Sequence, residues 1–382
     1  MTAFPLPQSE LATAGFREEQ IGRLVDLIER HVHEGRYPGC QIALARNGRL
    51  VLDRGFGQAR TAPVREPAER ETLWLLYSNT KVIVAAALWC LVEEGALTFQ
   101  DRVADHLQGF GEHGKGDITI VQLLTHQGGF PNAKVPADLW HDHTAVREAV
   151  CDFRLEWAPG SRVDYHTLAA HWVAAMLIEA LARVDYRDFI RTRLIEPLGL
   201  GRSLFVGLPE AGGRRAVDMH QPTADGAGQE RREEENTSYF RAAGVPGGGG
   251  YATAVAMATF YQMLVNGGRL GSTRLFSPRL IQYVTRNFTD DRTDHYMGMP
   301  MHRGLGPHVR GYTDTIRGLG SLGSPATFGH GGVGSSYCWA DPETGVSFAY
   351  LTNSRIPDPW HSRRLDIISN FVHTAIEDAT CR

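Results

Sequence analysis

The sequence predicts an α/β protein of the α+β type, in which an antiparallel sheet flanked by amino- and carboxy-terminal helices is joined to an inserted, mainly helical domain. Three observations predict this fold. β-type runs occur near the amino terminus and again in residues 327–352, helical patterns fill most of the chain between them, and helices stand at both ends. We expect residues 1–75 and 240–382 to form one discontinuous sheet domain, and residues 76–239 to form the helical domain.

At the amino terminus, the pattern predicts a helix followed by a hairpin. Residues 16–33 carry apolar side chains on one stripe and glutamate and arginine on the other. Two β-type runs, residues 40–46 and 49–55, then flank Asn47 and Gly48, which tolerate the positive φ angles of a type I′ turn. An antiparallel sheet therefore begins here.

The apolar run that follows Leu75 predicts a long helix, because Val84, Leu88 and Leu91 recur at helical spacing. Further patterns predict helices at residues 118–126, 165–183, 186–195, 252–266 and 363–379, and strands at residues 335–340 and 345–352.

The segment from Glu210 to Glu235 differs from its surroundings. It is rich in glycine, arginine and glutamate, has few apolar residues, and contains the charged run from Arg231 to Glu235. We interpret it as an exposed loop rather than a domain linker.

The bulk composition is that of an ordinary globular protein. The 382 residues are 42% hydrophobic and 21% charged, with a net charge of -4, so a nucleic-acid partner is not expected. The first 15 residues lack a basic region and an apolar core, and no stretch approaches membrane-spanning length. We therefore expect no membrane partner and a cytoplasmic location.

The five cysteines are scattered and odd in number, and most have apolar neighbours, which favours free thiols over disulfides. They are Cys40, Cys90, Cys151, Cys338 and Cys381. Cys-x-x-Cys pairs and helical His-x-x-x-His pairs do not occur, so we expect neither a metal nor a cofactor.

Ser78 and Lys81 stand three residues apart at the start of the long apolar helix. This spacing places both side chains on one face of a helix, near the amino-terminal N–H groups that favour negative charge. A lysine neutralised by burial and by the helix dipole can accept the proton of a serine hydroxyl and so activate it. The alternative is a capping serine beside a solvated lysine.

Two further stretches could assist such chemistry. Tyr165 follows Trp157-Ala-Pro-Gly160, and its phenol could handle protons beside a lysine, or it could be an ordinary half-buried tyrosine. The glycine-rich segment 328–334 could offer N–H groups to an oxyanion, or it could be a plain turn.

Three histidines, His126, His166 and His171, could suggest a Ser-His-Asp triad. The Gly-x-Ser-x-Gly elbow of that hydrolase class occurs around none of the serines, so the triad is disfavoured. We expect His126 to be a hydrogen-bonded structural residue near a helix end.

The order Ser78-x-x-Lys81, Tyr165, His330-Gly-Gly resembles the serine β-lactamase and penicillin-binding-protein superfamily, specifically its class C β-lactamase-like branch of esterases and transacylases. Other segments look similar to that family too, and together they span about residues 20 to 355: Pro38-Gly39, Leu123–Gly129, Glu196–Leu200, Gly248–Ala254 and Gly329–Gly332.

The resemblance implies a β-lactamase/transpeptidase-like fold with the active site between the two domains. It implies that Ser78 is acylated, that Lys81 accepts its proton, and that Tyr165 is the partner tyrosine. It further implies an oxyanion hole from the backbone N–H groups of Ser78 and Val333. The remaining residues that it implies as substrate contacts are Gln127, Thr167, His330, Gly331 and Gly332.

Two departures from the family pattern bear on the substrate. Thr167 stands where the tyrosine motif has asparagine, and His330 stands where lactamases have the lysine of Lys-Thr-Gly. A permanent cation for a substrate carboxylate is thereby lost. We therefore expect a carboxylesterase acting on short or medium acyl esters, ahead of an acyltransferase with an acyl donor and acceptor, a β-lactamase, or a binding module without turnover.

The walls of the substrate pocket are expected where family likeness is weakest, in residues 131–143, 210–240 and 289–315. Four aromatic residues in these ranges are equally compatible with an acyl pocket and with a core or surface role: Trp140, Tyr239, Phe240 and Tyr312. The sequence carries no indication of the oligomeric state.

Overall fold

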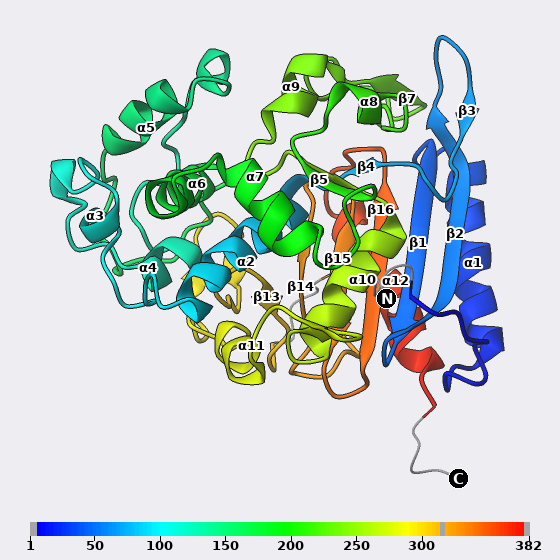
Figure 1. Cartoon of the computed structure of the whole chain (residues 1–382). Coiled ribbons are helices and arrows are strands. Elements are labelled where there is room, and N and C mark those ends of the chain that lie inside the picture. The colour runs from blue at the N-terminus through cyan, green and yellow to red at the C-terminus, as the bar shows by residue number, and fades with distance from the viewer. Residues whose placement is uncertain (1–5, 314–317, 378–382) are drawn as a thin grey trace.

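A computed structural model describes residues 6–313 and 318–377 of the chain (Figure 1). Its largest element is a seven-stranded antiparallel sheet in the order β13-β14-β15-β16-β1-β2-β3. The predicted fold class, with an antiparallel sheet built from both ends of the chain, is confirmed. The strands are β1 (Gly39–Arg46), β2 (Arg49–Arg60), β3 (Glu66–Pro67), β13 (His308–Val309), β14 (Phe328–Gly331), β15 (Tyr337–Asp341) and β16 (Val346–Thr352).

The hairpin between β1 and β2 turns at Asn47 (φ 49°) and Gly48 (φ 78°), as a type I′ turn requires. On its other side, β1 pairs with β16 along its length, from Cys40 opposite Thr352 to Arg46 opposite Val346. This pairing joins the two ends of the chain in one sheet.

Helices cover both faces of the sheet (Figure 1). On one face lie α1 (Glu18–His33) and α12 (Trp360–Ala375), and on the other lies α10 (Ala254–Val265). Side chains alternate along β1, so that Ile42 and Leu44 face α1 and α12 while Ala43 and Ala45 face α10. The small alanines allow the buried helix α10 to approach the sheet closely.

The middle of the chain forms the mainly helical part, on the left in Figure 1. At its centre α2 (Thr80–Glu93) packs against α6 (Ala169–Ala182), and both are buried on nearly every side. Around them lie α3 (Val103–His106), α4 (Ile120–Leu124), α5 (His143–Cys151) and α7 (Tyr186–Ile190). The other helices are α8 (Glu210–Gly213), α9 (Ser238–Ala243) and α11 (Pro278–Val284), with short helical turns at Tyr77–Asn79 (η1), Glu112–Gly114, Ala137–Leu139, Arg191–Ile195 and Glu234–Asn236.

The remaining short strands form small separate sheets. They are β4 (Trp74–Leu75), β8 (Gly250–Ala252) and β5 (Leu204–Val206) in one small sheet, and the pairs β6 (His220–Pro222) with β7 (Gln229–Arg231), β9 (Arg269–Leu270) with β10 (Thr273–Arg274), and β11 (Thr293–Asp294) with β12 (Met299–Pro300).

Two sequence-based expectations about local structure were wrong. The helix predicted from residue 165 begins at Ala169, because Val163 is extended and bridges to Asp294, which holds the following residues out of the helix. The segment 210–235 is not simply an exposed loop. It contains α8, β6 and β7, and it buries charged side chains such as Glu235, which is 4% exposed.

Cys40, Cys90 and Cys338 are buried, Cys151 is partly buried, and all four are free thiols, while Cys381 lies outside the described residues. Within residues 6–313 and 318–377, we find no helix with the length and apolar character needed to span a bilayer.

Candidate active site

Ser78 lies in a tight turn between β4 and α2. Leu76 donates its backbone N–H to Gly250 O (2.8 Å), which continues the pairing of β4 with β8 up to the turn. Tyr77 then takes a left-handed conformation (φ 45°), and Ser78 follows in the first turn of η1. Tyr77 and Asn79 are buried and Ser78 is only partly so, which leaves its hydroxyl within reach of a substrate.

Lys81 is fully buried directly beneath Ser78. Its Nζ lies 3.2 Å from Ser78 Oγ and donates to the carbonyl oxygens of Thr167 and Gly247, each at 2.6 Å. Burial, with a smaller contribution from the Arg303 charge, holds the pKa of Lys81 well below its usual value. A neutral amine has two N–H bonds and one lone pair. With two carbonyls accepting the N–H bonds, the lone pair is left for the serine hydroxyl.

The other residues of the Ser78–Lys81 motif hold the turn against its neighbours: Asn79 bonds to the residue that precedes β15 of the large sheet, and Thr80 bonds to β8 in the small sheet. Asn79 Nδ2 donates to Ser336 Oγ (3.2 Å), just before β15, and Gly250 N donates to Thr80 Oγ1 (2.9 Å). Gly332 also packs on the turn, because a Cβ added there would meet Leu76 O at 2.7 Å. The chain therefore needs a glycine at this contact.

Tyr165 stands over the Ser78–Lys81 pair. Its ring centroid lies 5.1 Å from Lys81 Nζ. Burial raises the pKa of Tyr165, although the neighbouring Ser78 side chain and the Arg303 charge act in the opposite direction. Tyr165 is therefore a protonated phenol at neutral pH, while Lys81 is the group that can accept a proton.

A buried ion pair lies behind Tyr165. Arg303 is 2% exposed, its Cζ lies 4.8 Å from the Tyr165 ring centroid, and its Nε donates to Asp294 Oδ2 (3.0 Å). Asp294 Oδ1 accepts the backbone N–H of Tyr165 (3.3 Å) and that of Tyr296 (3.1 Å). Sequence reasoning missed both charged residues, because nothing in the sequence pairs them with each other or with a tyrosine more than 120 residues away.

Buried neutral histidines surround the site. His126, 2% exposed, lies with its ring 4.5 Å from that of Tyr165, and its Nδ1 accepts from the backbone N–H of His166 (3.1 Å). Burial lowers the pKa of His126 and His171 well below the usual value and that of His166 to about 4. His126 is thus hydrogen-bonded, as predicted, but it also packs against Tyr165.

His330 lies on β14 and is 2% exposed. Its ring packs 4.1 Å from that of His308, and its Nδ1 lies 2.8 Å from Gly331 O. Burial and the nearby Lys81 lower the pKa of His330 to about 3, so it carries no charge at neutral pH. The position that bears a permanent cation in lactamases is therefore occupied here by a neutral ring.

The other residues implied as substrate contacts differ in whether their polar groups already have partners in the protein. The Gln127 side chain donates to Thr125 Oγ1 (2.7 Å) and accepts from Arg292 Nη2 (2.8 Å), while Thr167 gives its carbonyl to Lys81 and exposes its side chain. Val333 follows Gly331 and Gly332 after β14 and is 42% exposed. Within the described part of the chain, its backbone N–H donates to no protein acceptor.

The aromatic residues considered for an acyl pocket divide into two groups. Trp140 and Phe240 are buried in the core, whereas Tyr239 and Tyr312 are exposed. Tyr296, which the sequence did not single out, is 58% exposed and lies with its ring 5.6 Å from that of Tyr165.

One group of residues has the donor types of a metal site: His143, Glu179 and Asp185, within 4.8 Å of one another. These donors already have partners. His143 Nδ1 lies 2.7 Å from Glu179 Oε1, and Asp185 accepts from Arg187. The group serves the start of α7, where Asp185 accepts from the backbone N–H of Arg187 (2.8 Å) and Glu179 from that of Tyr186 (3.1 Å).

Comparison with known proteins shows the family of the chain. The Beta-lactamase family model matches residues 24–369. The chain is 26% identical over 396 residues to a protein of Salmonella typhimurium named putative D-alanyl-D-alanine carboxypeptidase, covering 92% of this chain and 88% of that protein.

Two solved structures are also similar to this chain. A penicillin-binding protein homologue from Caulobacter crescentus has a TM-score of 0.81 and 26% identity, covering 95% of this chain and 99% of its own. A family VIII carboxylesterase has a TM-score of 0.79 and 26% identity, covering 93% of this chain and 98% of its own. With the Ser78 turn, the buried lysine and the large antiparallel sheet, these matches lead to one conclusion: the chain belongs to the β-lactamase family, in the serine β-lactamase and penicillin-binding-protein superfamily of serine hydrolases.

Proposed function

We propose that this protein is a carboxylesterase that forms an acyl-enzyme on Ser78 and acts on short or medium acyl esters without a charge near the scissile carbonyl. The observation that carries the proposal is the pairing of Ser78 Oγ with the buried Lys81 amine at 3.2 Å, in a site whose nearby His330 is neutral. The Ser78–Lys81 pair supports acyl transfer through serine, and the neutral His330 supports an ester without a charged group as the substrate.

In the proposed reaction, Lys81 accepts the Ser78 proton as Oγ attacks the ester carbonyl. The lone pair of Nζ is the acceptor, since its two N–H bonds are directed to the carbonyls of Thr167 and Gly247. When the tetrahedral intermediate collapses, Tyr165 donates its phenolic proton to the leaving alkoxide and regains a proton from Lys81. Water then repeats the sequence on the acyl-serine and releases the carboxylic acid.

The negative oxygen of the intermediate requires donors that are fixed in advance. Two backbone N–H groups are proposed for this role. That of Ser78 lies in the first turn of η1, where helical N–H groups lack intrahelical partners, and that of Val333 follows β14. The contact of Gly332 with Leu76 supports this pairing, because it brings the end of β14 against the Ser78 turn.

The surroundings of the site favour a neutral, apolar substrate. β-Lactams and peptide tails carry a carboxylate, and a neutral His330 cannot hold a carboxylate as a lysine would. Exposed apolar surface at Tyr296 and Val333 offers contact to an acyl or alcohol group instead.

The proposal is tested with p-nitrophenyl esters of two to eight acyl carbons, a chromogenic cephalosporin and an acyl-D-alanyl-D-alanine peptide, each with wild type and Ser78→Ala. We expect ester hydrolysis by the wild type, loss of at least about 1,000-fold in Ser78→Ala, and an acyl adduct on the Ser78 peptide by mass spectrometry. Equal ester rates for the two proteins would refute the role of Ser78. A higher kcat/KM on the peptide or the cephalosporin would refute the ester preference.

Acyl transfer differs from hydrolysis only in the nucleophile that meets the acyl-serine. Adding alcohols or amines to the ester assay and measuring the transfer product against free acid distinguishes the two activities. Transfer that exceeds hydrolysis at millimolar acceptor would replace the esterase by an acyltransferase.

A further inference from the structure

The residue before Ser78 adopts a conformation that a side chain disfavours. Tyr77 has φ 45°, in the left-handed region that residues other than glycine, asparagine and aspartate rarely enter. The peptide plane between Tyr77 and Ser78 carries the Ser78 N–H, so the torsion angles of Tyr77 set the direction of that group. Such a conformation persists only where the surroundings hold it.

The phenol of Tyr77 is held by a carboxylate that is distant in the sequence. Tyr77 is 7% exposed, and its hydroxyl donates to Glu235 Oε1 at 3.0 Å. Burial and the neighbouring Glu235 raise the pKa of Tyr77 well above its usual value. The phenol therefore stays protonated and remains a donor.

Glu235 is itself deeply buried, at 4% exposure. Arg232 Nε donates to the same oxygen, Oε1, at 2.7 Å, and Arg232 is held in turn by Gln221. The second oxygen, Oε2, has no partner within the described residues. A buried carboxylate is unfavourable unless it is paired, so Glu235 depends on Arg232 and Tyr77.

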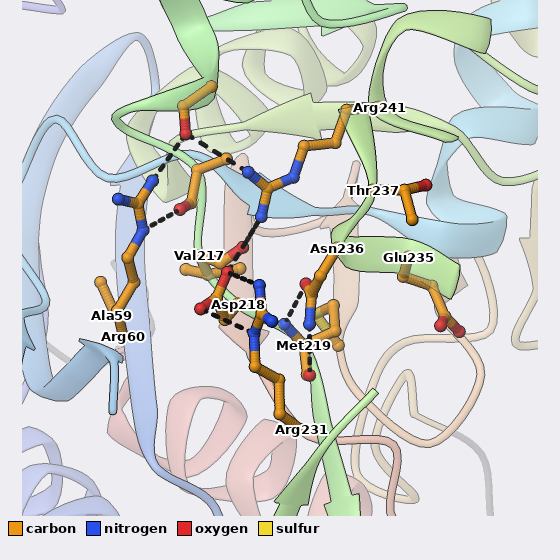
Figure 2. A network of polar contacts seen from close by, with 12 residues as sticks. Ala59, Arg60, Val217, Asp218, Met219, Arg231, Glu235, Asn236, Thr237 and Arg241 are labelled. Carbon is orange, nitrogen blue, oxygen red and sulfur yellow. Dashed lines mark hydrogen bonds and ion pairs between the residues drawn. The ribbon is translucent and has the colours of Figure 1, made fainter. Parts of the chain in front are cut away.

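The segment that presents Glu235 is tied to the large sheet (Figure 2). Asn236 exchanges hydrogen bonds with the backbone of Met219, at 2.8 Å and 3.0 Å, and Asp218 accepts from Arg231 and Arg241, both at 3.0 Å.

Asp218 N also donates to Ala59 O on β2 (3.0 Å). Glu235 is therefore presented by an anchored segment that ends on the sheet, and not by a free loop.

We propose that Glu235 is a positioning residue, which fixes the Tyr77 phenol and thereby aims the Ser78 N–H and side chain. The inference rests on the proposed role of Ser78 as nucleophile, and it assigns a task to the charged run that ends at Glu235. Removing the anchor lets Tyr77 leave the left-handed region, and this rotates the peptide plane next to Ser78.

The test compares wild type with Tyr77→Phe, Glu235→Leu and Glu235→Gln. Glu234→Gln is the matched control, since it makes the same charge change at the exposed neighbouring residue. The readouts are kcat and KM on the best ester, and the rate at which a fluorophosphonate probe labels Ser78. All are measured at a temperature where each variant is folded by circular dichroism.

We expect Tyr77→Phe and Glu235→Leu to lower kcat and the labelling rate by about 10- to 100-fold with little change in KM, because a misplacement of about 1 Å costs on the order of 100-fold. Glu235→Gln keeps an acceptor for the phenol and should restore most of the rate, and Glu234→Gln should match wild type. Folded variants with wild-type kcat and labelling would overturn the proposal, as would equal losses in Glu235→Gln and Glu235→Leu.

The backbone conformation of residue 77 tests the positioning role of Glu235 independently of any activity of Ser78. If Ser78 were unreactive even in wild type, the proposed function would fail. The φ of residue 77 in crystal structures of wild type and Glu235→Leu would then decide the positioning role. A shift out of the left-handed region in Glu235→Leu supports it, and an unchanged φ refutes it.

Discussion

Replacing Arg303 by glutamine should move the acid limb of the kcat/KM profile to higher pH. The Arg303 Cζ and the Lys81 Nζ lie 4.8 Å and 5.1 Å from the same Tyr165 ring centroid, so the two groups are no more than about 10 Å apart. At an effective dielectric constant of about 20, their repulsion is then at least about 1.7 kcal/mol, or about 1.2 pKa units. Removing the Arg303 charge should raise the pKa of Lys81 by about that much.

The sign follows from the role of Lys81 as a base. Lys81 works in its neutral form, so activity is lost as pH falls through its pKa, and a higher pKa places that loss at a higher pH. The assay is kcat/KM on a neutral ester from pH 5 to 10. Arg303→Lys keeps the charge and should leave the limb in place. The double variant Arg303→Gln/Asp294→Asn removes one charge of each sign and should shift it less than Arg303→Gln alone.

The same substitution has a cost in stability that must be measured alongside. Breaking a buried ion pair by removing one partner costs about 3–5 kcal/mol, and Asp294 would be left buried at 0% exposure. Urea unfolding measures this loss of stability, and thermal unfolding followed by circular dichroism identifies the temperature at which the variant is folded for the assay. An acid limb that stays in place or moves to lower pH in the folded variant would refute both the electrostatic argument and the identity of Lys81 as the base.

Two further predictions concern packing and acid stability. Gly332→Ala would place a Cβ 2.7 Å from Leu76 O and push β14 away from the Ser78 turn, so kcat on the ester should fall by about 100-fold. Gly22→Ala is the control, because a Cβ at that position has nothing within 4 Å. Equal activity of the two variants would contradict the contact. Burial lowers the pKa of His31 to about 4 in the folded protein, from the 6.5 of the unfolded chain. Between these pH values the unfolded chain binds a proton at His31 and the folded protein does not, so the free energy of unfolding falls as pH drops from about 6.5 towards 4. His31→Gln should therefore lose about 2 kcal/mol less unfolding free energy than wild type between pH 7 and pH 5; urea titrations at both pH values test this, and equal losses would refute it.

The sequence predicts those parts of the site that depend on residues close together in the chain. Ser78 and Lys81 lie together as their spacing requires, although Ser78 sits in a 3₁₀ turn and Lys81 in the following α-helix. Residues three apart share a face in both geometries, so the argument did not depend on which helix forms. The Asn47-Gly48 hairpin could be predicted for a similar reason, since its geometry depends on two adjacent residues.

What the sequence could not supply are contacts between distant charged residues. Arg303 and Asp294 meet Tyr165 across more than 120 positions, and Glu235 meets Tyr77 across 158. The composition of residues 210–235 predicted exposure because it is highly charged. That inference fails where charges of opposite sign neutralise one another, as Glu235 and Arg232 do at 2.7 Å.

Burial links the strength of the base to the choice of substrate in the proposed mechanism. The apolar surroundings that lower the pKa of Lys81, and so make it able to accept the Ser78 proton, also lower the pKa of His330 to about 3. A solvated site would protonate His330 more readily and could hold a carboxylate, but it would also protonate Lys81 and remove the base. An anion brought by the substrate would also raise the pKa of Lys81 and favour its protonated form. A site that uses a neutral lysine therefore works best on substrates that bring no anion. On this argument, a His330→Lys variant would offer a cation to carboxylate-bearing acyl donors and would lower the pKa of Lys81 further, so its acid limb on neutral esters should move to lower pH.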